Sequence, residues 1–236
     1  MRARIGIPAP AVVAQREPSS VVAEAFRVLR TNLQFLGLDE PLRSILLTSA
    51  APGEGKSTTA ANLGVAFAQA GTRVCLVDAD LRRPMLAKLL GLENWAGLTT
   101  ALIGQAPLEE CVKKTPVEGL WLLPSGPVPP NPAELLGSER MAALLERLKA
   151  EYDLVLIDSP PVLAVTDAAV LAPRTDGVVL VIRAGRTDRR AVQRARTALE
   201  TVHARVLGTV LGGVAQSEKE GYYYAYDRSS RPQHLK

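Results

Sequence analysis

The sequence predicts an α/β fold in which a mostly parallel central sheet is covered by helices on both faces. Six short apolar runs recur along its 236 residues, and stretches with helical character separate most of them. Strands that are buried on both faces form such continuous apolar runs, and parallel sheets flanked by helices are built from them. Apolar residues make up 47% of the chain, which is enough for the core of this fold.

The six runs are the expected strands, and ligands of such sheets bind at the carboxyl ends of the strands. In chain order the runs are SILLTSA, RVCLVDAD, GLWLLPSG, YDLVLIDSPP, GVVLVIRAG and RVLGTVLGGV. The pattern around them divides the chain into a flexible leader at 1–18, one domain at 19–214 and a mobile tail at 215–236. An amphipathic helix at residues 21–36 is expected to open the domain.

Composition and charge exclude several classes of protein. No apolar stretch approaches the roughly 18 residues of a membrane span, and Pro8 and Pro10 interrupt the run that a signal peptide would need. Cys75 and Cys111 form neither a disulfide framework nor a metal-ligand cluster. The net charge of +4 does not by itself indicate nucleic acid. We therefore expect a soluble cytoplasmic protein.

The most informative segment is SAAPGEGKST, residues 49–58, which lies between the first expected strand and a helix. That context is typical of a phosphate-binding loop. Gly53 and Gly55 let successive backbone N–H groups face one anion, and Lys56 adds a positive charge toward the outer phosphates. Ser57 supplies a hydroxyl of the kind that ligates Mg²⁺. The predicted nucleotide-binding residues are Pro52, Gly53, Glu54, Gly55, Lys56, Ser57 and Thr58.

Aspartates follow two further expected strands. Asp78 and Asp80 come at the end of VCLVDAD, and Asp158 ends LVLID. Because the carboxyl ends of parallel strands meet at one edge, three carboxylates converge there with the phosphate loop. Mg²⁺ prefers hard oxygen ligands and keeps several waters, so one carboxylate, the Ser57 hydroxyl and nucleotide phosphates can complete its shell. Asp158 fits the metal role best, and Asp80 is a second candidate ligand.

Asp78 and Asp80 would point the same way if their strand continued through both residues. One of them would then serve a metal-bound water and the other would accept a proton. A lone aspartate after a strand more commonly caps a turn or a helix, which is the alternative for each. Three such aspartates together with a phosphate-binding loop favour a catalytic site over three separate caps.

These motifs, occurring in this order, resemble the bacterial tyrosine kinases of exopolysaccharide and capsule systems, especially the stand-alone cytoplasmic CpsD/CapB type. APGEGKST is similar to the family's first phosphate motif, in which the first glycine is often absent, as it is at Ala50. VDADLRRP and LVLIDSPP are similar to its second and third motifs, and LPSGPVPPNPAELL also resembles a family segment. The resemblance implies a P-loop NTPase scaffold related to the MinD and ParA ATPases, and phosphorylation of tyrosine with ATP and Mg²⁺.

The roles that the resemblance implies follow the chemistry of phosphoryl transfer, which is mostly positioning and charge neutralisation. Lys56 and the magnesium ion would neutralise the phosphates. Asp78 or Asp80 would orient the incoming phenol, whose pKa near about 10 makes a carboxylate an adequate acceptor. Arg82 would steady phosphate charge, and a surface salt bridge is the alternative for it.

The tail holds most of the tyrosines and is similar to the family's usual autophosphorylation region. About eleven extended residues from Gly213 to Tyr224 span about 36 Å, which is enough to reach a neighbouring subunit. Four basic and three acidic side chains give the tail a net charge of +1. Each phosphate adds about −1.5 to −2, so we expect phosphorylation to eject the tail and loosen an assembly. The expected acceptors are Tyr222, Tyr223, Tyr224 and Tyr226.

The helix at 21–36 carries a second signal. Its flank has the spacing E-x-x-R-x-x-R, formed by Glu24, Arg27 and Arg30, which resembles the family's self-association motif. On spacing alone, a solvated flank with one Glu–Arg pair worth about 0.2 to 0.5 kcal/mol is the alternative. The resemblance favours a ring in which one subunit presents its tail to the next. The residues expected on the apolar face of the helix are Phe26, Leu29, Leu33 and Leu36.

Two other functions stay open. One is a MinD- or ParA-like switch ATPase that binds a membrane or DNA. Arg186, Arg190 and Arg194 would line one helix face for that purpose, although a solvated face is the commoner outcome. The tyrosine cluster and the missing amphipathic membrane tail favour a kinase, and nucleic acid is not an expected partner. The other function is a nucleotide-binding scaffold with little kinase activity.

The resemblance also implies partners and a location. Family members of this type commonly depend on a membrane-protein activator of the polysaccharide co-polymerase type. Its cytoplasmic segment would recruit the kinase to the inner face of the plasma membrane, and a cognate tyrosine phosphatase is a further candidate partner. Gly212 stands where the family often has an Asn near the adenine, so selectivity for ATP over GTP stays open.

Overall fold

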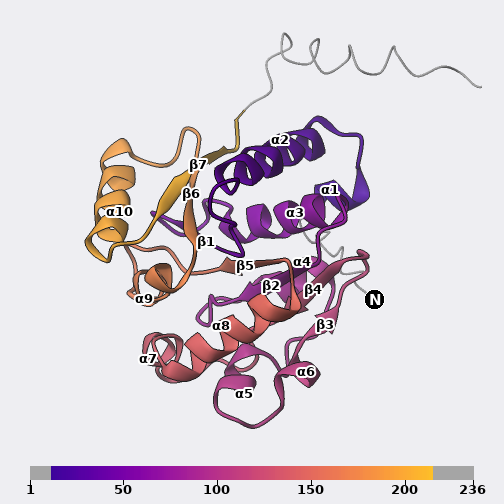
Figure 1. Ribbon diagram of the computed structural model, residues 1–236. Coiled ribbons are helices and arrows are strands. Elements are labelled where there is room, and N and C mark those ends of the chain that lie inside the picture. The colour runs from indigo at the N-terminus through magenta and orange to yellow at the C-terminus, as the bar shows by residue number, and fades with distance from the viewer. Residues whose placement is uncertain (1–11, 215–236) are drawn as a thin grey trace, which may run out of the picture.

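The computed structural model describes residues 12–214, which form a seven-stranded sheet between two layers of helices (Figure 1). The strand order is β3-β4-β2-β5-β1-β6-β7. Every predicted run forms a strand, which confirms the α/β fold with a mostly parallel sheet. These strands are β1 (Ser44–Ser49), β2 (Val74–Asp78), β4 (Leu120–Leu123), β5 (Leu154–Asp158), β6 (Gly177–Arg183) and β7 (Val206–Gly212).

Strand β3 (Lys113–Lys114) is the one that the apolar pattern does not predict. It consists of two polar residues and pairs with β4 in antiparallel register, with Lys113 opposite Leu122. All other neighbouring strands in the sheet are parallel. Their carboxyl ends therefore lie at one end of the sheet, where the sequence predicts the site.

One face of the sheet is covered by the four helices that come first in the chain. They are α1 (Val13–Arg16), α2 (Val21–Leu36), α3 (Lys56–Ala68) and α4 (Leu86–Leu90). Figure 1 shows α2 and α3 on the opposite side of the sheet from α8. Helix α3 is buried along almost its whole length, and its apolar side chains share one core with α2, α4 and the strands.

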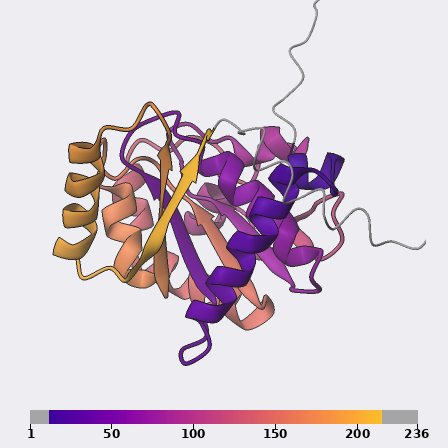
Figure 2. The same cartoon turned by 90° about the horizontal axis from the view of Figure 1, so that it is seen from above.

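The other face is covered by the later helices, which enclose a second apolar core. Seen from above, α2 and α10 lie on opposite sides of the strands (Figure 2). None of the helices within residues 12–214 is long and apolar enough to cross a membrane. The later helices are α5 (Leu98–Leu102), α6 (Leu108–Cys111), α7 (Pro132–Leu136), α8 (Glu139–Glu151), α9 (Asp167–Leu171) and α10 (Arg189–Thr201), with a 3₁₀ turn at Ala172–Arg174.

The predicted leader at 1–18 is wrong for its last residues, because helix α1 packs onto α3. Ala14 is 1% exposed, and its backbone N–H donates a hydrogen bond to Asn62 Oδ1 at 2.9 Å. Gln69 Nε2 donates in turn to the Ala14 carbonyl at 3.2 Å. Residues 1–11 of that leader, and the tail at 215–236 with its tyrosines, lie outside the described residues.

Helix α2 has the predicted bounds, and Ser20 caps it by accepting a hydrogen bond from a first-turn backbone N–H at 3.1 Å. Leu33 is buried, and Phe26 and Leu29 pack against the core. Leu36 is instead 46% exposed. The predicted apolar face is therefore wrong at this residue, because Leu36 ends the helix and lies about 60° around its axis from the buried Leu33.

Candidate active site

The phosphate-binding loop follows β1 and ends where α3 begins at Lys56. Gly53 and Gly55 have φ angles of +78° and +94°. Side chains with a Cβ rarely adopt this left-handed conformation, so both positions favour glycine. The turn brings backbone N–H groups to the amino end of α3, where they and the helix dipole favour an anion. This geometry fits the predicted nucleotide-binding role of the loop.

Glu54 fastens the loop to a distant part of the chain. Its side chain is buried, and its Oε2 accepts a hydrogen bond from the Ala51 backbone N–H at 3.0 Å. Its Oε1 accepts one from the Thr187 hydroxyl at 2.6 Å. Sequence reasoning placed Glu54 in the loop but missed Thr187, since no local pattern links residues that are 133 positions apart.

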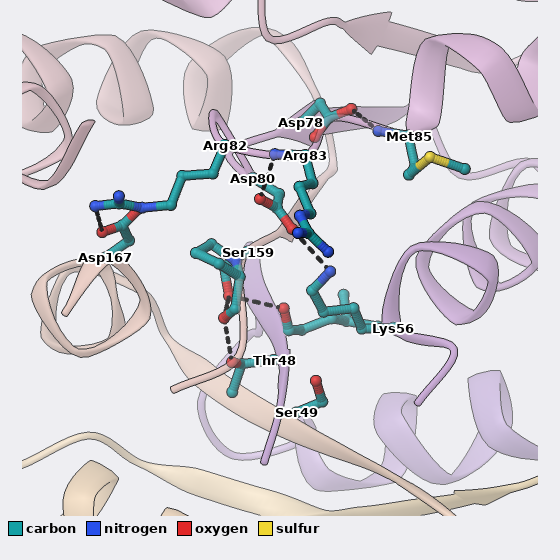
Figure 3. Close-up of polar contacts among 12 residues, drawn as sticks. Thr48, Ser49, Lys56, Asp78, Asp80, Arg82, Arg83, Met85, Ser159 and Asp167 are labelled. Atoms are coloured by element: carbon teal, nitrogen blue, oxygen red, sulfur yellow. Dashed lines mark hydrogen bonds and ion pairs between the residues drawn. The ribbon is translucent and has the colours of Figure 1, made fainter. Parts of the chain in front are cut away.

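Lys56 points toward the carboxylates that follow β2. Its Nζ lies 2.9 Å from Asp80 Oδ2, and the two side chains are only 12% and 4% exposed (Figure 3). Burial lowers the pKa of Lys56, but the charges of the Asp158 and Asp80 carboxylates outweigh this effect and raise it above its ordinary value. Asp80 Oδ1 also accepts a hydrogen bond from the Arg83 backbone N–H at 3.0 Å. The predicted cation and one predicted carboxylate are thus already paired.

Asp78 and Asp80 do not meet the condition under which both would point the same way. Strand β2 ends at Asp78, so the alternation of a strand does not continue to Asp80. Asp78 Oδ2 instead accepts hydrogen bonds from the backbone N–H groups of Met85 at 3.0 Å and Leu86 at 2.9 Å. Asp78 therefore caps the start of α4, as Figure 3 shows for Met85.

Asp158 ends β5 and lies directly opposite Asp78 in the parallel register. It is fully buried, yet neither of its carboxylate oxygens has a hydrogen-bond partner within residues 12–214. Burial raises the pKa of Asp158 to about 6, and the charge of Lys56 opposes that shift. The nearby Ser57 hydroxyl also opposes it, although it makes no hydrogen bond of normal geometry with either Asp158 oxygen. Burial and the nearby Asp158 also raise the pKa of Asp78 well above its ordinary value.

These residues fit a magnesium ion with a nucleotide. Buried acceptor oxygens without a partner are costly, and a cation would satisfy those of Asp158. The remaining oxygen of Asp78, Oδ1, is also buried without a partner among the described residues. Within residues 12–214, no group of three or more His, Cys, Asp or Glu side chains is arranged to hold a metal by itself. A shell shared with Ser57, waters and phosphates does not require one.

Arg82 has a buried partner that the sequence did not reveal. Its Nε and Nη2 donate to Asp167 Oδ2 at 2.9 Å and Oδ1 at 3.0 Å, a bidentate pair. Asp167 is fully buried, whereas the Arg82 side chain is 41% exposed. This contact ties the segment after β2 to α9, so the guanidinium predicted to steady phosphate charge is engaged in an ion pair here.

The expected stripe of arginines on one helix is wrong at Arg186. Helix α10 begins at Arg189, because Asp188 caps it by accepting a hydrogen bond from the Arg190 backbone N–H at 2.6 Å. Arg190 and Arg194 lie on that helix with exposed side chains. Arg186 lies in the preceding loop instead, and its guanidinium is next to Gly53 of the phosphate-binding loop.

The charged side chains on the flank of α2 contact other residues of the same chain. Arg27 forms an ion pair with Glu24 and donates to the Pro18 carbonyl. Arg30 Nη1 donates to the Ala66 carbonyl of α3 at 3.1 Å. The intrahelical pair is the contact that the alternative interpretation expects, and Arg30 ties two helices together. Self-association through these residues stays a prediction.

Comparisons with known proteins agree with this fold. A family model described as an AAA domain matches residues 42–207. Tyrosine-protein kinase YwqD of Bacillus subtilis strain 168 is 45% identical over 218 residues, which are 92% of each chain. Tyrosine-protein kinase CpsD of Streptococcus agalactiae is 39% identical over 88% of this chain and 91% of its own. Tyrosine-protein kinase Wzc of Salmonella typhimurium is 35% identical over 93% of this chain but only 31% of its own.

Solved structures give the same result. The chimerical protein CapA2B2 has a TM-score of 0.84 with 38% identity, covering 87% of this chain and 90% of its own. The kinase domain of Escherichia coli tyrosine kinase ETK also reaches 0.84, with 35% identity over 87% of this chain and 82% of its own. The septum site-determining protein MinD of Pyrococcus horikoshii, complexed with Mg-ADP, has a TM-score of 0.64 with 28% identity, covering 75% of this chain and 72% of its own.

The fold and the loop define an NTPase domain of the P-loop class, related to MinD. Within that class, the chain belongs to the bacterial tyrosine kinases. It is a protein-tyrosine kinase by its relatives and its fold.

Proposed function

We propose that this kinase transfers a phosphoryl group from ATP to tyrosines of its own tail, Tyr222, Tyr223, Tyr224 and Tyr226. The observation that carries the proposal is the meeting of a phosphate-binding loop with a buried carboxylate, Asp158, whose oxygens have no partner among the described residues. A site that holds a triphosphate and a metal in this way has the parts that phosphoryl transfer requires.

The residues of the chain divide the work between binding and positioning. The backbone N–H groups between Gly53 and Lys56 bind phosphate oxygens, and the Lys56 ammonium neutralises the outer ones. Ser57 and Asp158 are the residues that would hold Mg²⁺, which supplies charge neutralisation to the phosphates when bound. For Lys56 to reach a phosphate, its contact with Asp80 must open or be shared.

The acceptor phenol requires a carboxylate that is free to face it. Asp78 uses Oδ2 to cap α4, so only its Oδ1 is left for a water near the metal. Asp80 is paired with Lys56. When Lys56 binds phosphate instead, the Asp80 carboxylate becomes free to contact the phenol. We therefore assign the orientation of the phenol to Asp80, with proton transfer to this carboxylate as the phosphoryl group moves.

The tail reaches a second subunit in this proposal, and α2 joins the subunits into a ring. Support comes from the exposed apolar side chains of α2, since Val28 is 47% and Phe35 is 67% exposed. Arg27→Ala tests this contact better than Arg30→Ala, because Arg30 also holds α2 to α3. Light scattering should show a smaller mass for Arg27→Ala, and an unchanged mass would count against the ring.

A separate membrane protein is proposed as the activator that recruits the kinase to the inner face of the plasma membrane. The match covers only 31% of Wzc, which therefore has a long additional segment. We propose that a separate partner protein takes the place of that segment here. A cognate phosphatase would reverse the modification. In this role the kinase controls the synthesis and export of capsular or extracellular polysaccharide.

A mixing experiment tests transfer between subunits. The full chain with Lys56→Met serves as the acceptor, and the full chain with its four tail tyrosines changed to Phe serves as the donor. We expect phosphotyrosine on the Lys56→Met chain only when both proteins are present with magnesium and ATP. Phosphotyrosine on neither chain, while wild-type protein modifies itself, would show that transfer occurs within one subunit.

A further inference from the structure

The loop between β6 and α10, residues 184–188, lies against the phosphate-binding loop. The Thr187 hydroxyl donates to Glu54 Oε1 at 2.6 Å and accepts from the Arg183 backbone N–H at 2.8 Å. The Arg186 backbone N–H donates to the Arg183 carbonyl at 3.2 Å. These bonds fix the short loop to both β6 and the phosphate-binding loop.

Arg186 extends from this fixed loop to Gly53. A Cβ placed on Gly53 would lie 3.4 Å from Arg186 Nη1 and 3.5 Å from Nη2. The guanidinium therefore occupies the space beside the glycine that a side chain would fill. Within the described residues, the Arg186 side chain takes part in no ion pair and no hydrogen bond. An unpaired cation beside an anion-binding loop is placed to bind the same anion.

The order of the strands indicates which part of a bound nucleotide would lie near Arg186. Strand β1 leads into the phosphate-binding loop and lies between β5 and β6. Asp158 and Asp78 end the strands on the β5 side, so the metal and the transferred phosphate belong there. The nucleoside of a bound nucleotide would then extend toward β6 and β7, where a Cβ placed on Gly212 would lie 4.0 Å from the Glu54 carbonyl oxygen. Arg186 is on this nucleoside side.

We propose that Arg186 binds a non-transferred phosphate of the nucleotide, and that the contact between Thr187 and Glu54 positions it. This inference rests on the proposed nucleotide site. A guanidinium suits the role because its fixed fork of N–H donors matches phosphate oxygens and stays charged at any working pH. Since ADP keeps the phosphates that are not transferred, the contact serves ADP and ATP alike.

Calorimetric titration of the wild-type chain and three variants with ADP tests the proposal. Arg186→Ala should weaken ADP binding about tenfold, the usual scale for losing one charge-assisted contact. Thr187→Val should weaken ADP binding less, since the Arg186 guanidinium stays but its loop loses the hydrogen bond to Glu54. Arg190→Ala removes the same charge from the neighbouring helix and should bind ADP as the wild type does. Thermal melting without nucleotide checks that each variant is folded.

Salt separates a phosphate contact from stacking on the base. An ion pair is screened, so the affinity gap between wild type and Arg186→Ala should narrow as salt rises toward about 0.5 M. A gap that does not change with salt would overturn the phosphate contact. Wild-type affinity in Arg186→Ala would overturn any nucleotide role for this residue while leaving the proposed kinase intact. A wild-type chain that does not bind ADP would overturn both.

Discussion

Strands β2 and β5 end side by side, and the two carboxylates found there are held in different ways. Asp78 and Asp158 are opposite each other in the parallel register, and both are fully buried. Asp78 accepts two backbone hydrogen bonds at the start of α4. Asp158 has no hydrogen-bond partner for either oxygen among residues 12–214.

The difference separates support from ligand binding. A buried acceptor that is satisfied by backbone N–H groups stabilises the fold, whereas one without partners costs free energy until something binds it. Strands β2 and β5 both end in an aspartate, but one aspartate stabilises the fold and the other is available to bind a ligand. Asp158 has both carboxylate oxygens available for a cation, whereas Asp78 has only Oδ1 available and uses Oδ2 to hold the start of α4.

The largest effect is expected from Asp158→Asn. The amide keeps the size of the side chain but removes the charge that would hold magnesium. We expect the rate of tail phosphorylation to fall by at least about 10²-fold, the scale of losing one electrostatic contact in a transition state. The rate of phosphotyrosine formation with magnesium and ATP measures this. Wild-type rates would show that Asp158 is not part of the site.

Asp78→Ala should act mainly on stability. It leaves the backbone N–H groups of Met85 and Leu86 without their acceptor, so the free energy of unfolding should fall by about 2 kcal/mol. Asp78→Asn is the matched control, because it keeps an acceptor oxygen and removes only the charge. Denaturant unfolding compares the two variants. Equal losses in both would mean that the charge, and not the cap, is what matters.

The pH dependence of stability should distinguish Asp158→Asn from the wild type. Burial raises the pKa of Asp158 to about 6 in the folded chain, above its ordinary value. The folded state then holds a proton that the unfolded state has lost, so the wild type loses stability as pH rises between about 4 and 6. Asp158→Asn avoids this loss.

Melting in a metal chelator measures that difference. The variant should be more stable by about 1–3 kcal/mol near pH 8, and the gap should shrink toward about pH 4.5. A gap of constant size across this range would mean that Asp158 does not titrate as proposed.

A smaller effect is expected from Arg82→Ala. It leaves the buried Asp167 carboxylate without its bidentate partner. Because the Arg82 side chain is 41% exposed and water can enter, we expect a loss of about 1–2 kcal/mol in unfolding free energy. Adding Asp167→Asn should recover part of it, which a double-mutant cycle measures. Independent, additive losses would show that the pair is not coupled.

The sequence predicted the strands well because each is a self-contained signal. All five residues of β5 are buried, so its apolar run identifies it without its neighbours. Strand β3 could not be found this way, since its two lysines become a strand only by pairing with β4. The predicted leader likewise missed α1, whose order depends on contacts with α3.

The site was predictable where its residues share one motif and not where they meet across the fold. Gly53, Gly55 and Lys56 follow from local spacing. The partners of Glu54 and Arg82 lie 133 and 85 positions away, and nothing near Thr187 or Asp167 in the sequence identifies them. The orientation of an aspartate after a strand depends on where that strand ends, which only the structure provides.

We propose that this site phosphorylates the tail of the chain. Incubating the wild-type protein with magnesium and ATP and mapping phosphotyrosine by mass spectrometry tests this directly, with Lys56→Met and Asp158→Asn in parallel. We expect phosphate on Tyr222, Tyr223, Tyr224 or Tyr226 in the wild type and on none of them in either variant. Equal phosphotyrosine in all three proteins, or phosphate on no tail tyrosine of the wild type, would contradict it.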